Sequence, residues 1–266
     1  MRIVDLDLNW SRKMQFEHVF VIGAGGIGSH LMEPLARLLA YHKEGTKNIT
    51  LIDGDFYEEK NRTRQLFETR HVGKNKAAAL AEKIAETVFP ISHHPEFINK
   101  EKFLQIVEAK VLDRNQPIMV ITAVDNHATR KAVIQALDEA GYPNFAFLSG
   151  GNGYANGQIM SYVKLLGEPG TVHPLDKYDD LRFPPDHIPG QQDGCQEEAP
   201  AEPQLITANA SAALGLLWTV NAMLENDQWY EELHFNSRTM QLVPQGLPIK
   251  FPQIAIDRCK KVSLSV

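Results

Sequence analysis

The chain has 266 residues, of which 43% are hydrophobic and 23% charged, and its formal net charge at pH 7 is −6. This composition is typical of a soluble globular protein with a full core, and its negative charge argues against nucleic-acid binding through a broad basic surface. The two cysteines, Cys195 and Cys259, exclude a framework of several disulfides and a four-cysteine zinc site, so we expect no zinc and a reduced, cytoplasmic compartment.

Strand and helix patterns alternate along the first part of the chain. Strands are expected at 18–23, 48–53, 117–124, 144–148 and 158–166, and helices at 26–42, 73–88 and 126–140. The run at 117–124 is continuously apolar, as in a strand that is covered on both faces. This alternation predicts an α/β fold, a doubly wound, Rossmann-like and mostly parallel sheet.

The second part of the chain reads differently. Residues 167–203 are rich in Pro, Gly, Asp, Glu and Gln without periodicity, and they predict a long structureless crossover loop, 167–204. A helix at 205–225 and two strands near 231–236 and 239–243 follow, the strands as a C-terminal antiparallel extension. The helix is uncharged, but it is too polar for an easy bilayer span. We expect it in the core or at a subunit interface, and we expect no membrane partner.

A glycine-rich turn between the first strand and the first helix is the clearest local signal. Gly23, Gly25, Gly26 and Gly28 precede Ser29. Glycines let a backbone approach phosphates, and the new helix offers free N–H groups, so we predict a nucleotide-phosphate site here. Alone, the pattern also fits a nicotinamide-dependent dehydrogenase.

Polar side chains follow the second strand. Asp53 and Asp55 come directly after it, and Asp53 follows the glycine turn at roughly the spacing of about 20 residues expected for an acid that binds ribose. A simple strand-end turn is the alternative. Asn61, Arg64 and Gln65 come next, and Arg64 could bind phosphate oxygens, although a charged surface turn would look similar.

Two further residues stand where helices are expected to begin. Lys76 opens the second helix, where its charge opposes the helix dipole unless an anion lies nearby. Asp125 ends the strand at 117–124 and is followed by Asn126 and, one turn later, Arg130. Asp125 could hold Mg²⁺ or cap the helix that follows it.

Taken together, these motifs resemble the ThiF/MoeB/ubiquitin-activating-enzyme family of adenylyltransferases. The resemblance covers about residues 18–150 and continues more weakly to about 225. It implies a single domain over 1–266, with a nucleotide-binding core at 18–150 and a C-terminal part at 151–266. The shared elements are Gly-x-Gly-Gly-x-Gly-Ser (Gly23 to Ser29), Asp-x-Asp (Asp53, Asp55), Asn-x-x-Arg-Gln (Asn61, Arg64, Gln65), Gly-x-x-Lys (Gly73, Lys76) and Asp-Asn-x-x-x-Arg (Asp125, Asn126, Arg130).

The resemblance implies that Mg·ATP activates a carboxylate as an acyl-adenylate, commonly the C-terminal glycine of a ubiquitin-like or sulfur-carrier protein. By the same resemblance, Asp53 takes the ribose hydroxyls, Asn61, Arg64 and Lys76 contact the phosphates, and Asp125 organises the magnesium. These residue types suit a reaction that consists mostly of positioning and charge stabilisation.

The resemblance also implies a homodimer and an acyl-accepting cysteine ahead of the uncharged helix, where Cys195 stands. Glu197 and Glu198 nearby would raise the pKa of its thiol and lower its reactivity. The paired zinc-binding cysteines and the N-terminal arginine helix of many relatives are missing, and Arg12 is a candidate substitute for that arginine. The long acidic loop and short N-terminus resemble the compact ThiF-like proteins of the plasmid-associated PRTRC system.

Three alternatives stay open from the sequence. The chain could be a non-catalytic nucleotide-binding scaffold. It could instead activate a small carboxylate, a peptide or a tRNA-linked group. A nicotinamide-dependent dehydrogenase is a minor alternative, because it has no need for Arg64 and Lys76 beside a triphosphate.

Overall fold

The structure is a computed structural model, and it describes residues 15–42, 45–190, 204–225 and 228–249. Its centre is one sheet with the strand order β3-β2-β1-β4-β5-β6-β8-β9, in which β7 also pairs with β6. The parallel half holds β3 (Ser92–His94), β2 (Ile49–Ile52), β1 (His18–Ile22), β4 (Ile118–Thr122) and β5 (Phe145–Asn152). The antiparallel half adds β6 (Asn156–Leu165), β7 (Glu168–Pro169), β8 (Trp229–Asn236) and β9 (Gln241–Ile249).

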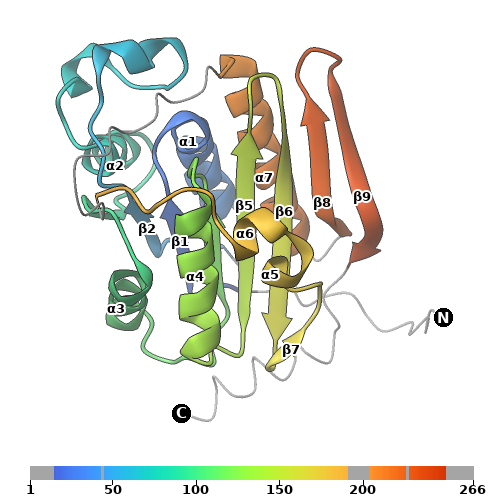
Figure 1. Cartoon of the computed structure of the whole chain (residues 1–266). Coiled ribbons are helices and arrows are strands. Elements are labelled where there is room, and N and C mark those ends of the chain that lie inside the picture. The colour runs from blue at the N-terminus through green and yellow to red at the C-terminus, as the bar shows by residue number, and fades with distance from the viewer. Residues whose placement is uncertain (1–14, 43–44, 191–203, 226–227, 250–266) are drawn as a thin grey trace.

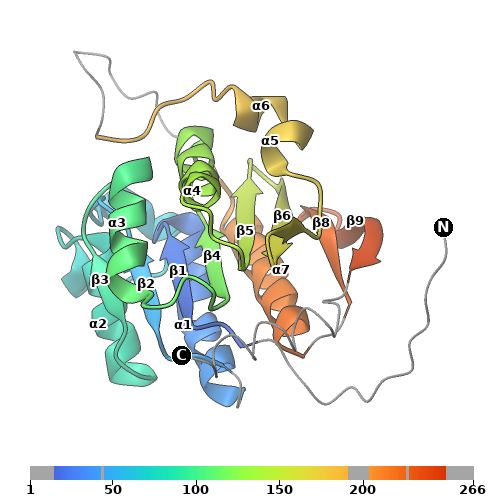
Figure 2. The ribbon, with the colours of Figure 1, turned by 90° about the horizontal axis from the view of Figure 1, so that it is seen from below.

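Helices cover both faces of this sheet (Figures 1 and 2). One face carries α1 (Gly26–Tyr41), α2 (Lys76–Thr87) and α7 (Ile206–Glu225). The other face carries α3 (Lys100–Lys110), α4 (His127–Glu139), α5 (Pro174–Lys177) and α6 (Asp179–Arg182). Two short 3₁₀ helices, η1 (Glu59–Thr63) and η2 (Thr69–His71), lie between β2 and α2.

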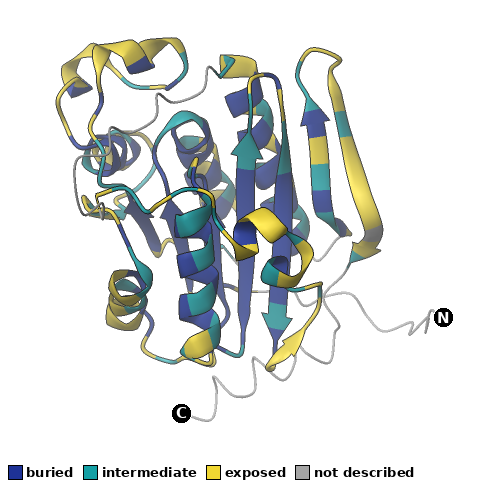
Figure 3. Cartoon of the chain, viewed as in Figure 1, coloured by how far each residue is buried: buried dark blue, intermediate teal, exposed yellow. Residues whose placement is uncertain are grey.

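The core follows from the strand sequences. Every residue of β1, β2 and β4 is buried, as the continuous apolar run at 117–124 predicts for β4, and Figure 3 shows buried strands at the centre of the sheet. Alternate side chains point to opposite faces. Val19 and Val21 therefore join the cluster under α1 and α7, whereas Phe20 and Ile22 join the cluster under α3 and α4.

The predicted fold class is confirmed. Parallel strands alternate with helices up to β5, and the strands at the C-terminal end are antiparallel. The order reverses at β1, which has β2 on one side and β4 on the other. A doubly wound sheet binds its ligands at such a switch point, beyond the carboxyl ends of the strands.

The prediction of a structureless run over 167–203 is wrong for its first part. Residues 168–182 form β7, α5 and α6. Pro174 and Leu181 are buried, and Leu181 joins the core cluster of α3 and α4. Each of the two helices has only four residues, so no helical periodicity marks them and distant contacts must hold them.

The two outer strands differ from the inner ones. β9 closes the described part of the sheet beside β8; it is mostly exposed and carries Pro244 and Pro248 (Figure 3). At the other edge, β3 has three residues, Ser92, His93 and His94, all at least partly exposed. No helix in the described ranges is long and apolar enough to cross a membrane.

Candidate functional site

A large cavity opens at the carboxyl ends of the parallel strands, with a volume of about 1480 Å³. This exceeds the roughly 300–1,000 Å³ of typical small-molecule sites, so the cavity has room for more than one ligand. We distinguish two ends. The glycine-loop end is lined by Gly23, Gly25, Gly26, Asp53, Asp55, Asn61, Arg64, Gln65, Lys76 and Asp125, and the hairpin end by Asn152, Gly153, Asn156, Gln158, Lys177, Tyr178 and His234.

The glycines of the loop serve different purposes. Gly23 has φ of +103°, and a Cβ there would lie 2.6 Å from the Ala123 carbonyl oxygen, so only glycine fits. At Gly25 the nearest atom to such a Cβ is Gln65 Nε2 at 3.8 Å, so this position is open. Gly28 packs on the carbonyl of Gly23 and does not line the cavity.

Ser29 also lies outside the cavity lining. Its hydroxyl donates to the Gly26 carbonyl at 3.1 Å and accepts from the Leu66 N–H at 3.0 Å. The serine thereby joins the start of α1 to the segment that carries Arg64. This bond connects two parts of the glycine-loop end that are far apart in sequence.

Asp53 lies at the end of β2 and faces the glycine loop. Its Oδ2 accepts the Ala24 N–H at 2.6 Å, and its Oδ1 accepts the Asp55 N–H at 2.8 Å. Burial raises the pKa of the Asp53 carboxyl, although Lys76 and the two N–H donors act against it. Each carboxylate oxygen retains a further lone pair, so the group can still accept hydroxyl donors.

Lys76 is buried at the first position of α2, and its Nζ pairs with the half-exposed carboxylate of Asp55. The Lys76 N–H donates to the Asp55 carbonyl at 2.8 Å. Asn75 caps the helix and donates from Nδ2 to the carbonyls of Asp53 and Asp55, at 2.8 and 3.0 Å. The Asp55 carboxylate thus compensates the charge of Lys76, which the dipole of α2 would otherwise disfavour.

Asn61, Arg64 and Gln65 form the wall opposite β2. Asn61 and Gln65 are buried, and the Asn61 side-chain oxygen accepts the Glu58 N–H at 3.0 Å. Arg64 is partly exposed, and its Nη1 lies 3.4 Å from Gln204 Oε1, just before α7. The Arg64 N–H donates to the Asn61 carbonyl at 3.1 Å, and the arginine lines the cavity.

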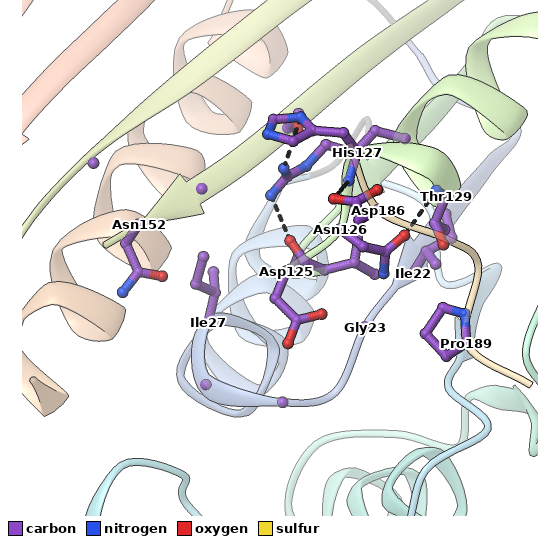
Figure 4. Close-up of a pocket in the computed structure, with 18 of the residues that line it drawn as sticks. Ile22, Gly23, Ile27, Asp125, Asn126, His127, Thr129, Asn152, Asp186 and Pro189 are labelled. Carbon is purple, nitrogen blue, oxygen red and sulfur yellow. Dashed lines mark hydrogen bonds between the residues drawn. The ribbon is translucent and has the colours of Figure 1, made fainter. Parts of the chain in front are cut away.

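Asp125 is exposed beyond the end of β4 and has no hydrogen-bond partner among the described residues. Figure 4 shows its carboxylate free, near Gly23 of the glycine loop and Ile27 at the start of α1. The neighbouring Asn126 caps α4 by accepting the Thr129 N–H at 2.8 Å. The capping role considered for Asp125 thus falls to Asn126, which leaves Asp125 open to a ligand.

Arg130 lies buried behind Asp125. Its Nη2 donates to the carbonyls of Val124 and Gly150, the latter at 3.2 Å. Burial lowers the pKa of its guanidinium, and the nearby carboxylates of Asp125 and Asp186 oppose that shift. A guanidinium keeps its proton in proteins, so Arg130 places a positive charge under the exposed carboxylate.

The site fits a magnesium ion only together with a substrate. In the described ranges no group of three His, Cys, Asp or Glu side chains could hold a metal ion. Mg²⁺ is commonly bound by one or two carboxylates plus substrate phosphates. Asp125, which is exposed and has no hydrogen-bond partner among the described residues, is a carboxylate that could take part in such a site.

The hairpin end is built around Glu232 on β8. This buried carboxylate accepts from Tyr178, pairs with Lys177, and lies 2.7 Å from His234 Nε2. Burial alone would raise its pKa, but the hydrogen bonds from Lys177, Tyr178 and His234 prevail and lower the pKa to about 2. The network fastens the α5–α6 segment over β6 and β8.

The strap, residues 183–190, crosses from α6 over the start of α4. Asp186 accepts the backbone N–H groups of His127 and Ala128, each at 2.8 Å (Figure 4). Two otherwise unpaired donors at the α4 N-terminus are satisfied in this way. The strap thereby forms a wall of the cavity beside Asp125.

The structure brings most of the predicted residues together. Gly28 and Ser29 support the loop from outside the cavity, whereas Asn126 does line it. Arg12, Cys195 and Cys259 lie outside the described residues. The sequence reasoning missed Asp186, Glu232 and Asn209 as parts of the site, because no motif marks them and long-range contacts alone bring them there.

Comparison with known proteins gives a consistent picture. The sequence pattern of the ThiF family matches residues 2–246. The adenylyltransferase and sulfurtransferase Uba4 of Aspergillus clavatus is 33% identical over 131 residues, 49% of this chain but 24% of that protein. The catalytic subunit of the NEDD8-activating enzyme E1 of Arabidopsis thaliana is 37% identical over 83 residues, 31% of this chain and 17% of that protein.

Solved structures resemble the whole fold. The crystal structure of PaaA matches with a TM-score of 0.58 and 16% identity, over 87% of this chain and 64% of that one. Escherichia coli MccB crystallised with ATP matches with a TM-score of 0.56 and 18% identity, over 88% and 64%. This chain spans about a quarter of the length of the Uba4 protein and less than two thirds of these two structures.

Proposed function

This chain belongs to the ThiF family, and we propose that it is an ATP-dependent adenylyltransferase that activates a carboxylate as an acyl-adenylate. One observation carries the proposal. A single cavity gathers the glycine loop, Asp53, Arg64, Lys76 and Asp125 at one edge of the sheet. Cationic groups and a free carboxylate around a phosphate loop suit charge stabilisation at phosphorus.

In the proposed complex, the triphosphate lies against the glycine loop and the N-terminus of α1, where backbone N–H groups face it. The free lone pairs of Asp53 accept the ribose hydroxyls. Arg64 and Asn61 bind phosphate oxygens. Lys76 exchanges its pairing with Asp55 for a phosphate oxygen, and such an exchange keeps its buried charge compensated.

The chemical step joins a carboxylate oxygen to the α-phosphorus. The bond from that phosphorus to the bridging oxygen breaks, and pyrophosphate leaves with the electron pair. Arg64 and Lys76 stabilise the charge that develops on the leaving phosphates, and the cavity holds the reacting atoms in line. Mg²⁺, which Asp125 would hold, supplies further neutralisation of phosphate charge when bound.

For the second substrate we propose a ubiquitin-like or sulfur-carrier protein that ends in glycine. Two observations support this choice. The Uba4 and NEDD8-activating relatives have names that refer to such chemistry. The cavity also extends beyond the glycine-loop end by way of the β5–β6 hairpin, where a chain terminus could enter beside the nucleotide.

Exchange of labelled pyrophosphate into ATP tests the function. We expect exchange that depends on a candidate carrier protein and is lost in Asp125→Ala. Exchange that depends on a peptide or a small carboxylate would show that this compound, and not a carrier protein, is the second substrate. The absence of exchange with any carboxylate, despite ATP binding, would overturn the enzymatic function and favour a scaffold.

We further propose that Cys195, which lies outside the described residues, accepts the acyl group. Its thiolate sulfur would bond to the acyl carbon, and AMP would leave with the electron pair of the broken carbon–oxygen bond. Such chemistry needs a reduced thiol, so we propose a cytoplasmic location. A Cys195→Ala variant whose carrier linkage persists and resists thiol reduction would overturn the thioester.

A homodimer through α7 completes the proposal. Leu214 and Trp218 lie one turn apart on this helix and are 43% and 53% exposed, beside a face that is buried in the core. Light scattering after gel filtration should report a dimer that Trp218→Glu dissociates. A monomeric wild-type protein would overturn the dimer without affecting the adenylyltransferase proposal.

A further inference from the structure

The side chain of Asn209 lies deep in the molecule, in the first part of α7. It is 0% exposed, and its neighbours on the buried face of the helix are Ala208, Ala212 and Ala213. A polar side chain in such a position costs free energy unless its hydrogen bonds are satisfied. Its Oδ1 has no hydrogen-bond partner within the described residues, so packing and stability alone do not account for an asparagine here.

Its amide touches both halves of the glycine-loop end. Nδ2 donates to the carbonyl oxygen of Arg64 at 3.0 Å. The same amide fills the space beside Gly26, where a Cβ would lie 2.6 Å from both Nδ2 and Oδ1. One side chain therefore connects the backbone of the arginine to the backbone of the glycine loop.

We propose that Asn209 is a positioning residue that fixes Arg64 against the glycine loop for nucleotide binding. The inference rests on the proposed function, because it assumes that this end of the cavity binds a triphosphate. Among the described residues, the Arg64 side chain has one weak hydrogen bond, to Gln204 at 3.4 Å. The place of its charge is set mainly by its backbone, and the Asn209 amide holds that backbone carbonyl.

The two middle glycines of the loop then differ in purpose. Gly25 is open toward the cavity, so a methyl group there would meet the ligand first. Gly26 is closed by Asn209, so a methyl group there would meet the protein first. Neither glycine has positive φ, but Gly25 has φ −78° and ψ −137°, a combination that L residues rarely adopt. Gly25→Ala therefore carries a backbone strain that does not involve Asn209, whereas the clash of Gly26→Ala is with the Asn209 amide.

The first experiment measures Mg·ATP binding by calorimetry and the melting temperature without ligand. Asn209→Ala should weaken ATP binding about tenfold, because Arg64 loses its fixed position. It should lower the melting temperature only slightly, because the loss of the Nδ2 donor to the Arg64 carbonyl is partly offset by removal of the unsatisfied Oδ1. Asn221→Ala on the same helix, whose amide contacts His42 far from the cavity, should leave ATP binding unchanged. If Asn209→Ala fails to fold, Asn209→Ser, which is too short to reach Arg64, takes its place.

The second experiment uses the space around Gly26. Gly26→Ala alone should lower the melting temperature, and addition of Asn209→Ala should restore much of it, because the added methyl group then occupies the vacated volume. Gly25→Ala serves as the matched control, and Asn209→Ala should not rescue it. This readout needs no nucleotide.

The outcomes distinguish the positioning role of Asn209 from the proposed function. If wild-type protein binds ATP and Asn209→Ala binds it equally well, the positioning role is overturned and the proposed function stands. Failure of Asn209→Ala to rescue Gly26→Ala also overturns it. If the wild-type protein binds no ATP, the proposed function fails, and this inference fails with it.

Discussion

The two ends of the cavity are held together in different ways. At the glycine-loop end, short polar contacts to backbone groups fix Asp53, Asn61 and Asn75, and most of them span fewer than about 30 residues. At the hairpin end, one charge network joins Tyr178 to Glu232 across 54 positions of the chain. The first end is fixed mostly by local contacts, whereas the second depends on side chains of a distant segment, α5–α6.

This difference suggests a division of labour. A nucleotide is the same in every reaction cycle and benefits from a fixed site, because preorganised groups need no rearrangement at the moment of reaction. The protein terminus that we propose as second substrate must enter and leave, so the wall at the hairpin end has to admit it. Substitutions at the two ends should therefore affect different measurements.

The largest effect is expected at Asp125. Asp125→Ala should reduce pyrophosphate exchange by about 10²–10³-fold, because it removes the carboxylate beside the developing charge. The melting temperature should not change, since Asp125 is exposed and contacts no described partner. The control is Asp113→Asn, because Asp113 lies in the turn before β4, at the amino end of that strand. Equal exchange in both variants would remove Asp125 from the mechanism.

Glu232 tests the hairpin end through pH. Its pKa is lowered from 4.5 to about 2 in the folded protein, so its contribution to stability is complete above pH 4.5 and is lost as the pH falls toward 2. That contribution is on the order of 3 kcal/mol. Glu232→Gln should therefore have a lower melting temperature than wild type at pH 7, and this difference should disappear as the pH falls toward 2. A difference in melting temperature that does not depend on pH would contradict the charge network.

The same variant distinguishes the two ends functionally. Glu232→Gln should raise the KM for the carboxylate substrate, because the α5–α6 segment is loosened, and leave ATP affinity unchanged. A parallel loss of ATP affinity would show that the two ends are not independent.

A smaller effect is expected at Lys76. Lys76→Met should weaken ATP binding about tenfold, since one phosphate contact is lost. The free energy of unfolding should change little, because the Asp55 carboxylate that loses its partner is half exposed to water. Lys74→Met, which breaks an exposed pair with Glu82, is the matched control for calorimetry. Equal affinities in the two variants would exclude Lys76 from the phosphate site.

The smallest effect is expected at the strap. Asp186→Ala removes the acceptor of two N–H groups at the start of α4 and should cost about 1 kcal/mol of unfolding free energy. Denaturant unfolding measures this loss. Since the strap borders both ends of the cavity, any change in ATP affinity should be less than that in Lys76→Met.

The sequence predicted the parallel half well, because β1, β2 and β4 are mostly apolar and polar residues follow each strand. It missed β3, whose residues Ser92, His93 and His94 show no apolar pattern. It missed α3 as well, because only Phe103 and Val107 of that helix are buried, with Leu104 and Ile106 packed partly against the core.

The same distinction applies to the site. Asp53, Lys76 and Asp125 stand next to recognisable strand ends or helix starts, so local patterns pointed to them. Arg64 was found from the Asn-x-x-Arg-Gln motif. Asn209 and Glu232 stand inside a helix and a strand, where a single polar residue carries no signal until the fold brings its partner near. Contacts across long stretches of chain cannot be inferred from spacing in one sequence.

The outer strand β9 has a consequence for how this protein can associate with others. A proline has no N–H group, so Pro244 and Pro248 cannot supply the donors that an added strand would need. The opposite edge strand, β3, is short and polar, so it offers few backbone groups to an added strand. Growth of the sheet by edge-to-edge pairing, the usual start of strand-mediated aggregation, is therefore disfavoured at both ends of the described sheet, and association is directed to the helical faces.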